Sequence, residues 1–296
     1  MIENGVYPAL VTPFGATGKV DLPGVARLLA WSEAAGCKGA VLAGTNGEGP
    51  SLSAFEKRDL IRSATACKGK MTVILGISTP SLDEAKWLCH QASQCGADSV
   101  LLMPPSYFRP ADPVGLRDWF EEVISSSKVP VLAYNFPQKT GVILDPALLS
   151  RLTQHEQFIG AKDSSGESKN FVDYREALPE HSLFVGDETL LLQALKAGWN
   201  GTISGAANLV GNWLSEIVRS WFDSDLEQAA IRFELILPIL KLIRQGPQPA
   251  ANKAVLKRLG IIEDDRLRLP LVPAPEETVM TLEQQLGVTL GLRHPN

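Results

Sequence analysis

A lysine at the end of an apolar run is the first residue of this sequence that suggests chemistry. Lys162 directly follows the residues FIGA (158–161), a run typical of a buried strand. Lysine is rarely buried, because removing its ammonium group from water is costly. Such a lysine either caps the strand into solvent or is held inside, where an apolar interior favours the neutral amine. A neutral amine attacks a ketone or aldehyde to form a Schiff base.

Two other stretches carry groups that suit this chemistry. Tyr134 lies in the apolar run VPVLAYNFP (129–137), and its phenol either packs at the strand end or shuttles the protons that carbinolamine formation needs. The turn GTNGEG (44–49) has small residues whose N–H groups can converge on an anion, although a tight turn before a helix would look the same. The P-loop pattern is absent, so the turn is better suited to bind a small carboxylate than a nucleotide.

These residues lie at the ends of short apolar runs that alternate with helical patterns along most of the chain. Nearly continuous apolar runs are typical of parallel strands that are covered on both faces. The runs are 6–14, 39–44, 71–78, 98–105, 129–137, 158–162, 183–187 and 201–207. Eight such units predict an α/β protein with a (β/α)8 TIM barrel. An open doubly wound sheet has the same local pattern, but no G-x-G-x-x-G follows the first strand.

Helix start signals separate the predicted strands. Ser53 and Ser81 each precede a glutamate by three positions, which is the capping-box pattern, and Gly96 is a plausible helix end. Asp112 and Pro113 form a cap followed by a proline at the first helical position. From about residue 224 only helical patterns remain. We therefore predict a barrel over residues 1–223 and a helical extension packed on it over 224–296.

Composition narrows the function. The chain has 296 residues, 45% of them hydrophobic and 21% charged, and a formal net charge of -5. This mild acidity argues against a nucleic-acid partner, and no apolar run is long enough to span a bilayer. The opening MIENGVYPAL lacks the pattern of a signal peptide, so we expect a cytoplasmic protein. The four cysteines and four histidines are dispersed, so we expect neither a metal site nor a disulfide framework.

The motifs in order resemble the dihydrodipicolinate synthase/N-acetylneuraminate lyase family of pyruvate-dependent class I aldolases. The resemblance covers about residues 5–260 and rests on GTNGE, YNFP, GAKDSSG, VGDE and GTIS at compatible spacings. It implies that Lys162 forms an imine with pyruvate and that Tyr134 is the proton relay. It also implies that no metal or organic cofactor is needed, because the imine itself is the electron sink.

The same resemblance gives roles to further residues. Thr45 and Asn46 match the pair that holds the pyruvate carboxylate, and Thr45 also links the relay to solvent. Gly186 and Ile203 match positions whose backbone lines the lysine pocket. Tyr107 matches a tyrosine that reaches across a tight dimer into the partner's relay. The resemblance therefore implies a homo-oligomer, either a dimer or a dimer of dimers.

Two departures from the synthases of this family concern the second substrate. Their Y-N-x-P-x-R-T-G pattern supplies an arginine for its carboxylate, whereas YNFPQKTG (134–141) has Lys139, which keeps the charge without the bidentate fork. Asn46 replaces the usual threonine, and an amide suits a polyhydroxylated chain. Both changes favour an aldolase that acts on a 2-keto-3-deoxy sugar acid or 4-hydroxy-2-oxo acid.

Three alternatives stay open from the sequence. The first is 4-hydroxy-tetrahydrodipicolinate synthase activity, which serves lysine biosynthesis, and the second is a dehydratase acting on a keto-deoxy sugar acid through the same Schiff base. The third is a barrel that binds a small acid but catalyses no reaction. A pair of intact lysine and tyrosine residues argues against that third alternative, since a binding protein does not need a buried amine.

Overall fold

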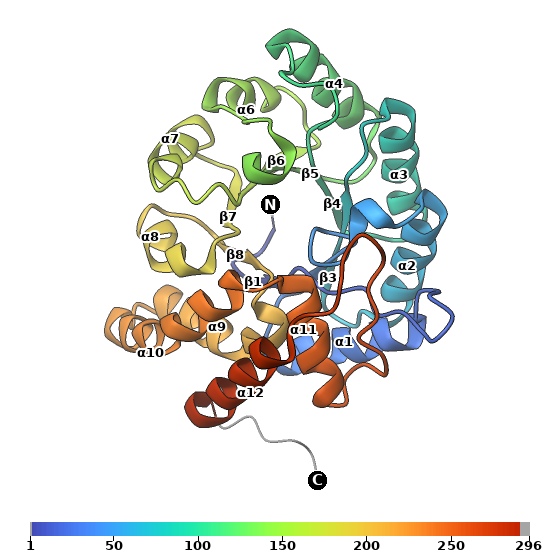
Figure 1. The fold of residues 1–296 in the computed structure, drawn as a ribbon. Helices are drawn as coiled ribbons and strands as arrows, with labels where there is room; N and C mark the ends of the chain where they lie inside the picture. The colour runs from blue at the N-terminus through green and yellow to red at the C-terminus, as the bar shows by residue number, and fades with distance from the viewer. Residues whose placement is uncertain (1, 291–296) are drawn as a thin grey trace.

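The chain, described here by a computed structural model that covers residues 2–290, contains one sheet of eight parallel strands surrounded by helices (Figure 1). The strands are β1 (Gly5–Pro8), β2 (Gly39–Leu42), β3 (Thr72–Ile77), β4 (Ser99–Leu102), β5 (Val131–Asn135), β6 (Phe158–Asp163), β7 (Ser182–Val185) and β8 (Gly201–Ser204). Each predicted apolar run overlaps one of them. The eight predicted strands are therefore confirmed, although most are shorter than the runs that predicted them.

The sheet closes into a barrel. Hydrogen bonds join the strands in the order β1-β8-β7-β6-β5-β4-β3-β2, and a parallel bridge between Ala9 and Val41 connects the first strand to the second. The amide of Leu10 donates to the carbonyl of Val41 at 2.9 Å across this junction. This closed parallel order confirms the predicted (β/α)8 TIM barrel and excludes the open doubly wound sheet.

Helices cover the outside of the strand ring (Figure 1). They are α1 (Leu22–Ala34), α2 (Ala54–Cys67), α3 (Leu82–Gln94), α4 (Pro113–Ser126), α5 (Pro137–Thr140), α6 (Pro146–Leu152), α7 (Lys169–Ala177), α8 (Leu191–Lys196), α9 (Ala207–Phe222), α10 (Leu226–Gln245), α11 (Gln248–Arg258) and α12 (Glu276–Leu290). Ser53 and Glu56 form the predicted capping box of α2, and the side chains of Ser81 and Asp112 accept hydrogen bonds at the starts of α3 and α4.

Most of the strands end earlier than the apolar runs because the backbone turns at the rim. After β2, Ala43 has a φ of 53°, in the left-handed region that ends an extended strand. After β4, Pro104 and Pro105 lack the N–H groups that a strand ladder needs. These apolar residues belong to the βα loops, so hydrophobicity alone overestimates the length of the strands.

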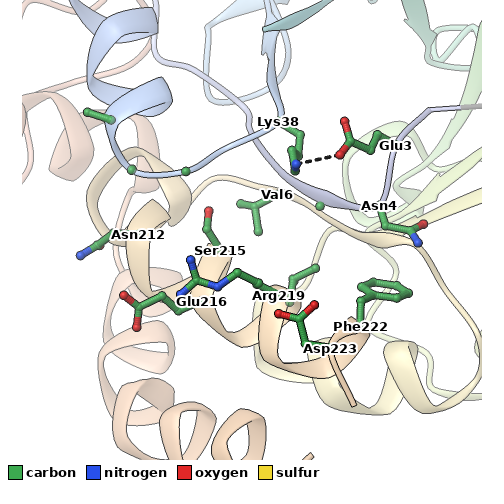
Figure 2. A pocket seen from close by; sticks show the side chains of 15 residues that line it. Glu3, Asn4, Val6, Lys38, Asn212, Ser215, Glu216, Arg219, Phe222 and Asp223 are labelled. Atoms are coloured by element: carbon green, nitrogen blue, oxygen red, sulfur yellow. Dashed lines mark ion pairs between the residues drawn. The ribbon is translucent and has the colours of Figure 1, made fainter. Parts of the chain in front are cut away.

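A charged pocket of about 620 Å³ lies beside the amino end of β1, between the end of α1 and α9 (Figure 2). Lys38, just before β2, pairs with Glu3 at 2.7 Å, while Glu216, Arg219 and Asp223 line the pocket from α9 and its end. This edge of a barrel usually serves stability, since the chemistry of such barrels is built at the carboxyl edge. The functional site is therefore expected at the opposite edge.

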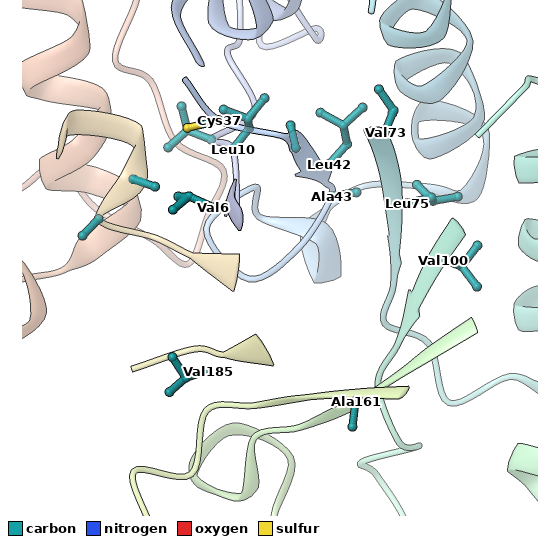
Figure 3. Close-up of a cluster of buried hydrophobic side chains, with 14 of the residues drawn as sticks. Val6, Leu10, Cys37, Leu42, Ala43, Val73, Leu75, Val100, Ala161 and Val185 are labelled. Carbon is teal, nitrogen blue, oxygen red and sulfur yellow. The ribbon is translucent and has the colours of Figure 1, made fainter. Parts of the chain in front are cut away.

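Two layers of buried side chains follow from the two-residue period of the strands. The inner layer fills the barrel with Tyr7, Val41, Ile74, Leu101, Leu132, Phe184 and Ile203. The outer layer packs under the helices and includes Val6, Leu42, Val73, Val100, Ala161 and Val185 (Figure 3). Because Ala161 points outward, the next residue of β6, Lys162, points into the barrel.

The C-terminal helices share this core. Ile236 and Leu240 of α10, Val255 of α11, and Val279 and Leu282 of α12 belong to the same buried cluster as the outer faces of the strands. In Figure 1 the three helices gather on one side of the ring, beside α9. No helix among residues 2–290 is long and apolar enough to cross a membrane.

A buried ion pair attaches α11 to the barrel rim. The ammonium of Lys253 contacts the carboxylate of Glu48 in the GTNGEG turn, and both side chains are fully buried. Lys253 also donates to the carbonyl of Arg266 at 2.8 Å, and the amide of Arg268 donates to Glu48 at 2.8 Å. Burial lowers the pKa of Lys253, while the adjacent Glu48 carboxylate opposes this shift. The pair connects the rim turn, α11 and the segment after it.

Replacing Lys253 with methionine should therefore destabilise the protein strongly. The change leaves the Glu48 carboxylate buried without its cation, which typically costs about 3–5 kcal/mol of unfolding free energy. Urea denaturation measures the loss. Lys257→Met is the matched control, because Lys257 pairs with Asp265 at 2.7 Å but is 45% exposed, so it should change the unfolding free energy by less than about 1 kcal/mol. Equal losses in the two variants would contradict this role of Lys253.

A second ion pair predicts how stability depends on pH. Arg268 binds both carboxylate oxygens of Glu56, and this contact is the main reason why the pKa of Glu56 falls from its ordinary 4.5 to about 2. A carboxyl group with a depressed folded-state pKa stabilises the fold fully above its unfolded pKa. That stabilisation is lost as the pH falls from about 4.5 toward 2.

We therefore expect Arg268→Met to be less stable than the parent protein near neutral pH, with a difference that shrinks as the pH falls from about 4.5 toward 2. Because Glu56 is partly exposed, solvent screening keeps the effect small. Urea unfolding of both proteins across this pH range makes the comparison. A stability difference that stays constant on the acid side would show that the Glu56 carboxylate is not its source.

Candidate functional site

Lys162 and Tyr134 are brought together by the pairing of β5 with β6. The two residues are register partners in adjacent parallel strands, and both side chains point into the barrel. The Lys162 Nζ lies 4.2 Å from the centroid of the Tyr134 ring. Lys162 is only 5% exposed and Tyr134 only 3%. The lysine is therefore held inside, and it does not cap its strand into solvent.

Ser164 and Gly186 complete the surroundings of this pair. The hydroxyl of Ser164 donates to the Tyr134 hydroxyl at 3.4 Å. A Cβ atom on Gly186 would lie 1.9 Å from Ser164 Oγ and 2.8 Å from Lys162 Cε, so any larger residue here would displace both side chains. Ser164 was not predicted, although it lies two residues after Lys162 and the two-residue period of a strand indicates the same face.

These residues line a cavity of about 510 Å³ at the carboxyl edge of the barrel. Its walls include six of the eight residues that the sequence identified. They are Lys162, Tyr134, Thr45, Asn46, Lys139 and Gly186. The C-terminal part of the chain forms the remaining wall and contributes residues that the sequence did not identify. Those lining residues are Arg244, Gly246, Pro247, Gln248, Pro249, Pro270 and Leu271.

The other two predicted residues lie outside the cavity wall. Ile203 is fully buried in the inner layer of the barrel, and the glycine two positions later, Gly205, lines the cavity in its place. Tyr107 lies on the surface, 78% exposed, with its ring 5.2 Å from that of Phe108. Within this chain, Tyr107 is not among the residues that line the Lys162 cavity.

The GTNGEG turn offers a hydrogen-bond donor to the cavity. The Thr45 hydroxyl is buried and has no hydrogen-bond partner within residues 2–290. An unsatisfied buried hydroxyl is costly, so its position beside the cavity indicates a ligand oxygen. The Asn46 amide, in contrast, is already engaged: its Nδ2 donates to Gln248 at 3.3 Å, and its Oδ1 accepts from Asn252 at 3.5 Å.

Acidic groups neutralise the arginine in the cavity wall. Arg244 at the end of α10 lies 3.1 Å from Asp187 and 3.1 Å from the buried Glu188, and it also donates to the carbonyl of Gly186 at 3.3 Å. Glu188 in turn accepts from Ser204 at 2.6 Å. This network fixes the turn after β7 against α10. No local pattern in the sequence indicates this network, because Arg244 is far from the barrel motifs in the chain.

Asp163 fixes the backbone beside Lys162. Its carboxylate accepts hydrogen bonds from Asn135 at 2.7 Å and from the hydroxyl of Ser165 at 2.7 Å, and its carbonyl accepts from the amide of Gly186. These bonds join the ends of β5, β6 and the turn after β7. Asp163 is thus a structural residue, and it holds Lys162 in place.

A buried lysine beside a phenol and an unpartnered hydroxyl, at the carboxyl edge of a closed parallel barrel, is the arrangement of an enzyme that forms Schiff bases. Among the described residues, no group of three or more His, Cys, Asp and Glu side chains is placed to hold a metal ion.

Comparisons with known proteins agree with this class. The sequence profile of the Dihydrodipicolinate synthetase family matches residues 3–288. The 4-hydroxy-tetrahydrodipicolinate synthase of Moorella thermoacetica is 33% identical over 274 residues, which are 92% of this chain and 93% of that protein. The chain belongs to the dihydrodipicolinate synthetase family, and it is a lyase of the pyruvate-dependent class I aldolase type.

Solved structures show the same fold over the whole chain. A prophage protein of the dihydrodipicolinic acid synthase family from E. coli K12, solved in complex with pyruvate, has a TM-score of 0.93 at 26% identity and covers 98% of this chain and 99% of its own. The 4-hydroxy-tetrahydrodipicolinate synthase from Methylacidiphilum fumariolicum SolV has a TM-score of 0.91 at 31% identity, with coverage of 97% and 96%.

Proposed function

We propose that Lys162 is the residue that forms the imine with pyruvate. The amine attacks the 2-oxo carbon, and Tyr134 passes the protons that convert the carbinolamine into the imine with loss of water. Thr45 donates its free hydroxyl to the pyruvate carboxylate, and Asn46 supports the same turn. The observation that carries this proposal is the position of the buried Lys162 Nζ, 4.2 Å from the Tyr134 ring, inside the cavity.

The rest of the cycle follows from the imine. The C3 methyl of the protonated imine loses a proton, and the resulting enamine attacks the carbonyl carbon of an aldehyde to form a C–C bond. Water then releases the product from Lys162 and restores the amine. In reverse, the same steps cleave a 2-oxo acid to pyruvate and an aldehyde.

We propose that the 2-oxo acid that the enzyme forms or cleaves is a 2-keto-3-deoxy sugar acid or a 4-hydroxy-2-oxo acid. The second substrate is then the aldehyde that this acid yields together with pyruvate. The cavity has Lys139 where the family's synthases have an arginine, so it lacks the planar fork that binds a carboxylate with two bonds. Lys139 is exposed and can reach one substrate oxygen. The volume of about 510 Å³ has room for a substrate larger than pyruvate.

A second candidate function is 4-hydroxy-tetrahydrodipicolinate synthesis. It is favoured by the names of relatives that are 31–33% identical to this chain, among them those of Halalkalibacterium halodurans and Moorella thermoacetica. A dehydratase acting on a keto-deoxy sugar acid would use the same imine.

One set of assays separates these reactions. Pyruvate consumption is measured with glyceraldehyde, glycolaldehyde and aspartate semialdehyde, and release of pyruvate is measured with 2-keto-3-deoxygluconate. Our proposal predicts turnover with the hydroxyaldehydes and release of pyruvate from the sugar acid. Turnover with aspartate semialdehyde alone would establish the synthase. Loss of water from 2-keto-3-deoxygluconate without release of pyruvate would establish the dehydratase.

We also propose that the protein works as a homo-oligomer, a dimer or a dimer of dimers. Tyr107 and Phe108 form an aromatic pair that is 78% and 81% exposed, and exposed aromatic side chains are typical of surfaces that bind a partner. In this arrangement Tyr107 would enter the relay of the other subunit. Sedimentation equilibrium measures the assembly. The cytoplasmic location expected from the N-terminal sequence stays a prediction, which cell fractionation would test.

A further inference from the structure

The C-terminal extension places at the cavity a side-chain amide whose nitrogen lacks a hydrogen-bond acceptor among the described residues. Gln248, the first residue of α11, lines the same cavity as Lys162. Its Nε2 is buried and has no hydrogen-bond partner among the residues that the structure describes. A buried donor without an acceptor typically costs about 1–3 kcal/mol, so such a group in a native protein needs an explanation. Thr45 Oγ1 is the other buried unpartnered group that lines this cavity.

A series of amides sets the orientation of Gln248. The carbonyl of Gly205 can only accept, and it receives hydrogen bonds from Asn252 Nδ2 at 3.0 Å and Asn208 Nδ2 at 2.8 Å. The same Asn252 nitrogen donates to Asn46 Oδ1, and Asn46 Nδ2 donates to Gln248 Oε1 at 3.3 Å. Each amide is thus oriented by the one before it. The series ends at Gln248 Nε2, which must be a donor.

The fold leaves space for this series. A Cβ atom on Gly205 would lie 2.4 Å from Asn46 Nδ2 and 2.6 Å from Gln248 Oε1. A larger residue at position 205 would therefore push the side-chain amides of Asn46 and Gln248 apart. The contact joins three parts of the molecule, namely the turn after β2, the turn after β8 and α11. Gln248 is held by a built arrangement and is not a free surface side chain.

Charge indicates what kind of oxygen Gln248 would bind. On this side of the cavity, Arg244 is matched by Asp187 and Glu188, and Lys253 is matched by Glu48. The wall beside Gln248 therefore presents no excess positive charge for a second carboxylate. Lys139 lies on α5, a separate element of the cavity lining. A neutral N–H donor in a charge-balanced wall suits a hydroxyl group.

We propose that Gln248 is a specificity-determining residue that donates a hydrogen bond to a hydroxyl group of the aldehyde substrate. The inference rests on the proposed function, and it deepens it by naming the substrate class as hydroxyaldehydes and the residue that selects them. The sequence suggested that the Asn46 amide binds the hydroxyl groups of the substrate. We assign this role to Gln248 instead, because the Asn46 amide is engaged by Gln248 and Asn252.

The test compares two aldehydes of equal chain length, glyceraldehyde and propionaldehyde, which differ in their hydroxyl groups. In the full-length protein we expect kcat/KM to favour glyceraldehyde. Gln248→Met keeps a side chain of similar length but removes the donor, and it should lower the ratio of the two kcat/KM values by roughly tenfold. Gln245→Met is the matched control, because Gln245 is exposed at the end of α10 and does not line the cavity.

Reductive trapping of pyruvate alone separates this inference from the proposed function. If Gln248 binds the aldehyde and not pyruvate, the pyruvate concentration that gives half-maximal trapping stays within about twofold of the parent value in Gln248→Met. An unchanged glyceraldehyde preference in that variant would overturn the role of Gln248. A weaker affinity for pyruvate by the same factor as the lost preference would also overturn it, because the amide would then serve pyruvate. Failure of the parent protein to trap pyruvate would instead remove the proposed function.

Discussion

Lys162→Ala will abolish turnover, with a loss on the order of 10⁴-fold or more, because it removes the buried amine beside Tyr134 that would form the imine. The substitution removes a side chain that is 5% exposed and points into the barrel, so the variant keeps the packing of the outer layer. Pyruvate consumption with a hydroxyaldehyde measures the effect, and circular dichroism confirms that the variant is folded.

Lys169→Ala is the control for this prediction. Lys169 begins α7 shortly after Lys162 in the chain, is largely exposed and pairs with Asp173 at 3.5 Å. We expect its activity to match that of the parent protein. If Lys162→Ala retained a substantial part of the parent rate, the amine would not be the covalent catalyst, and the proposed mechanism would be wrong.

Tyr134→Phe should slow turnover by roughly 10²- to 10⁴-fold while leaving the fold intact. The ring stays in place and keeps its contact with the Lys162 Nζ, but the hydroxyl that would carry protons is gone, and Ser164 loses its hydrogen-bond partner. Because imine formation needs proton transfer, borohydride trapping with pyruvate should become slow. Its final extent should be unchanged, since the amine is still present.

Tyr7→Phe is the matched control, the same change in another tyrosine of the barrel interior. The Tyr7 hydroxyl donates to the carbonyl of Glu3 at 2.8 Å, near the amino edge of the strands. Its loss should lower stability by about 1 kcal/mol without changing the rate. A Tyr134→Phe protein that trapped pyruvate at the parent rate would show that the phenol does not relay protons.

The strands and the juxtaposition of Lys162 with Tyr134 could be predicted from the sequence because local pattern specifies them. Continuous apolar runs identified all eight strands, and the two-residue period places Lys162 and Tyr134 on the inner face once the barrel closes. The rim was harder to predict. Ala43 is apolar yet adopts a left-handed conformation, so the run that contains it extends beyond the end of β2.

The wall built by the C-terminal extension could not be predicted in this way. Arg244 and Gln248 reach the cavity only because α10 and α11 pack beside the barrel, and that packing depends on distant contacts such as Glu48 with Lys253. No local pattern reports a contact between residues two hundred positions apart. The role expected for Asn46 depended on the same contacts, since it is α11 that engages the Asn46 amide.

The most direct test of the central claim is to locate the covalent adduct. The protein is incubated with pyruvate and borohydride, digested, and the labelled peptide is sequenced by mass spectrometry. We predict one reduced pyruvate adduct per chain, on Lys162, and no adduct in Lys162→Ala. A protein that stays unlabelled, or that carries its label on a different lysine such as Lys139, would contradict the assignment of Lys162 as the imine-forming residue.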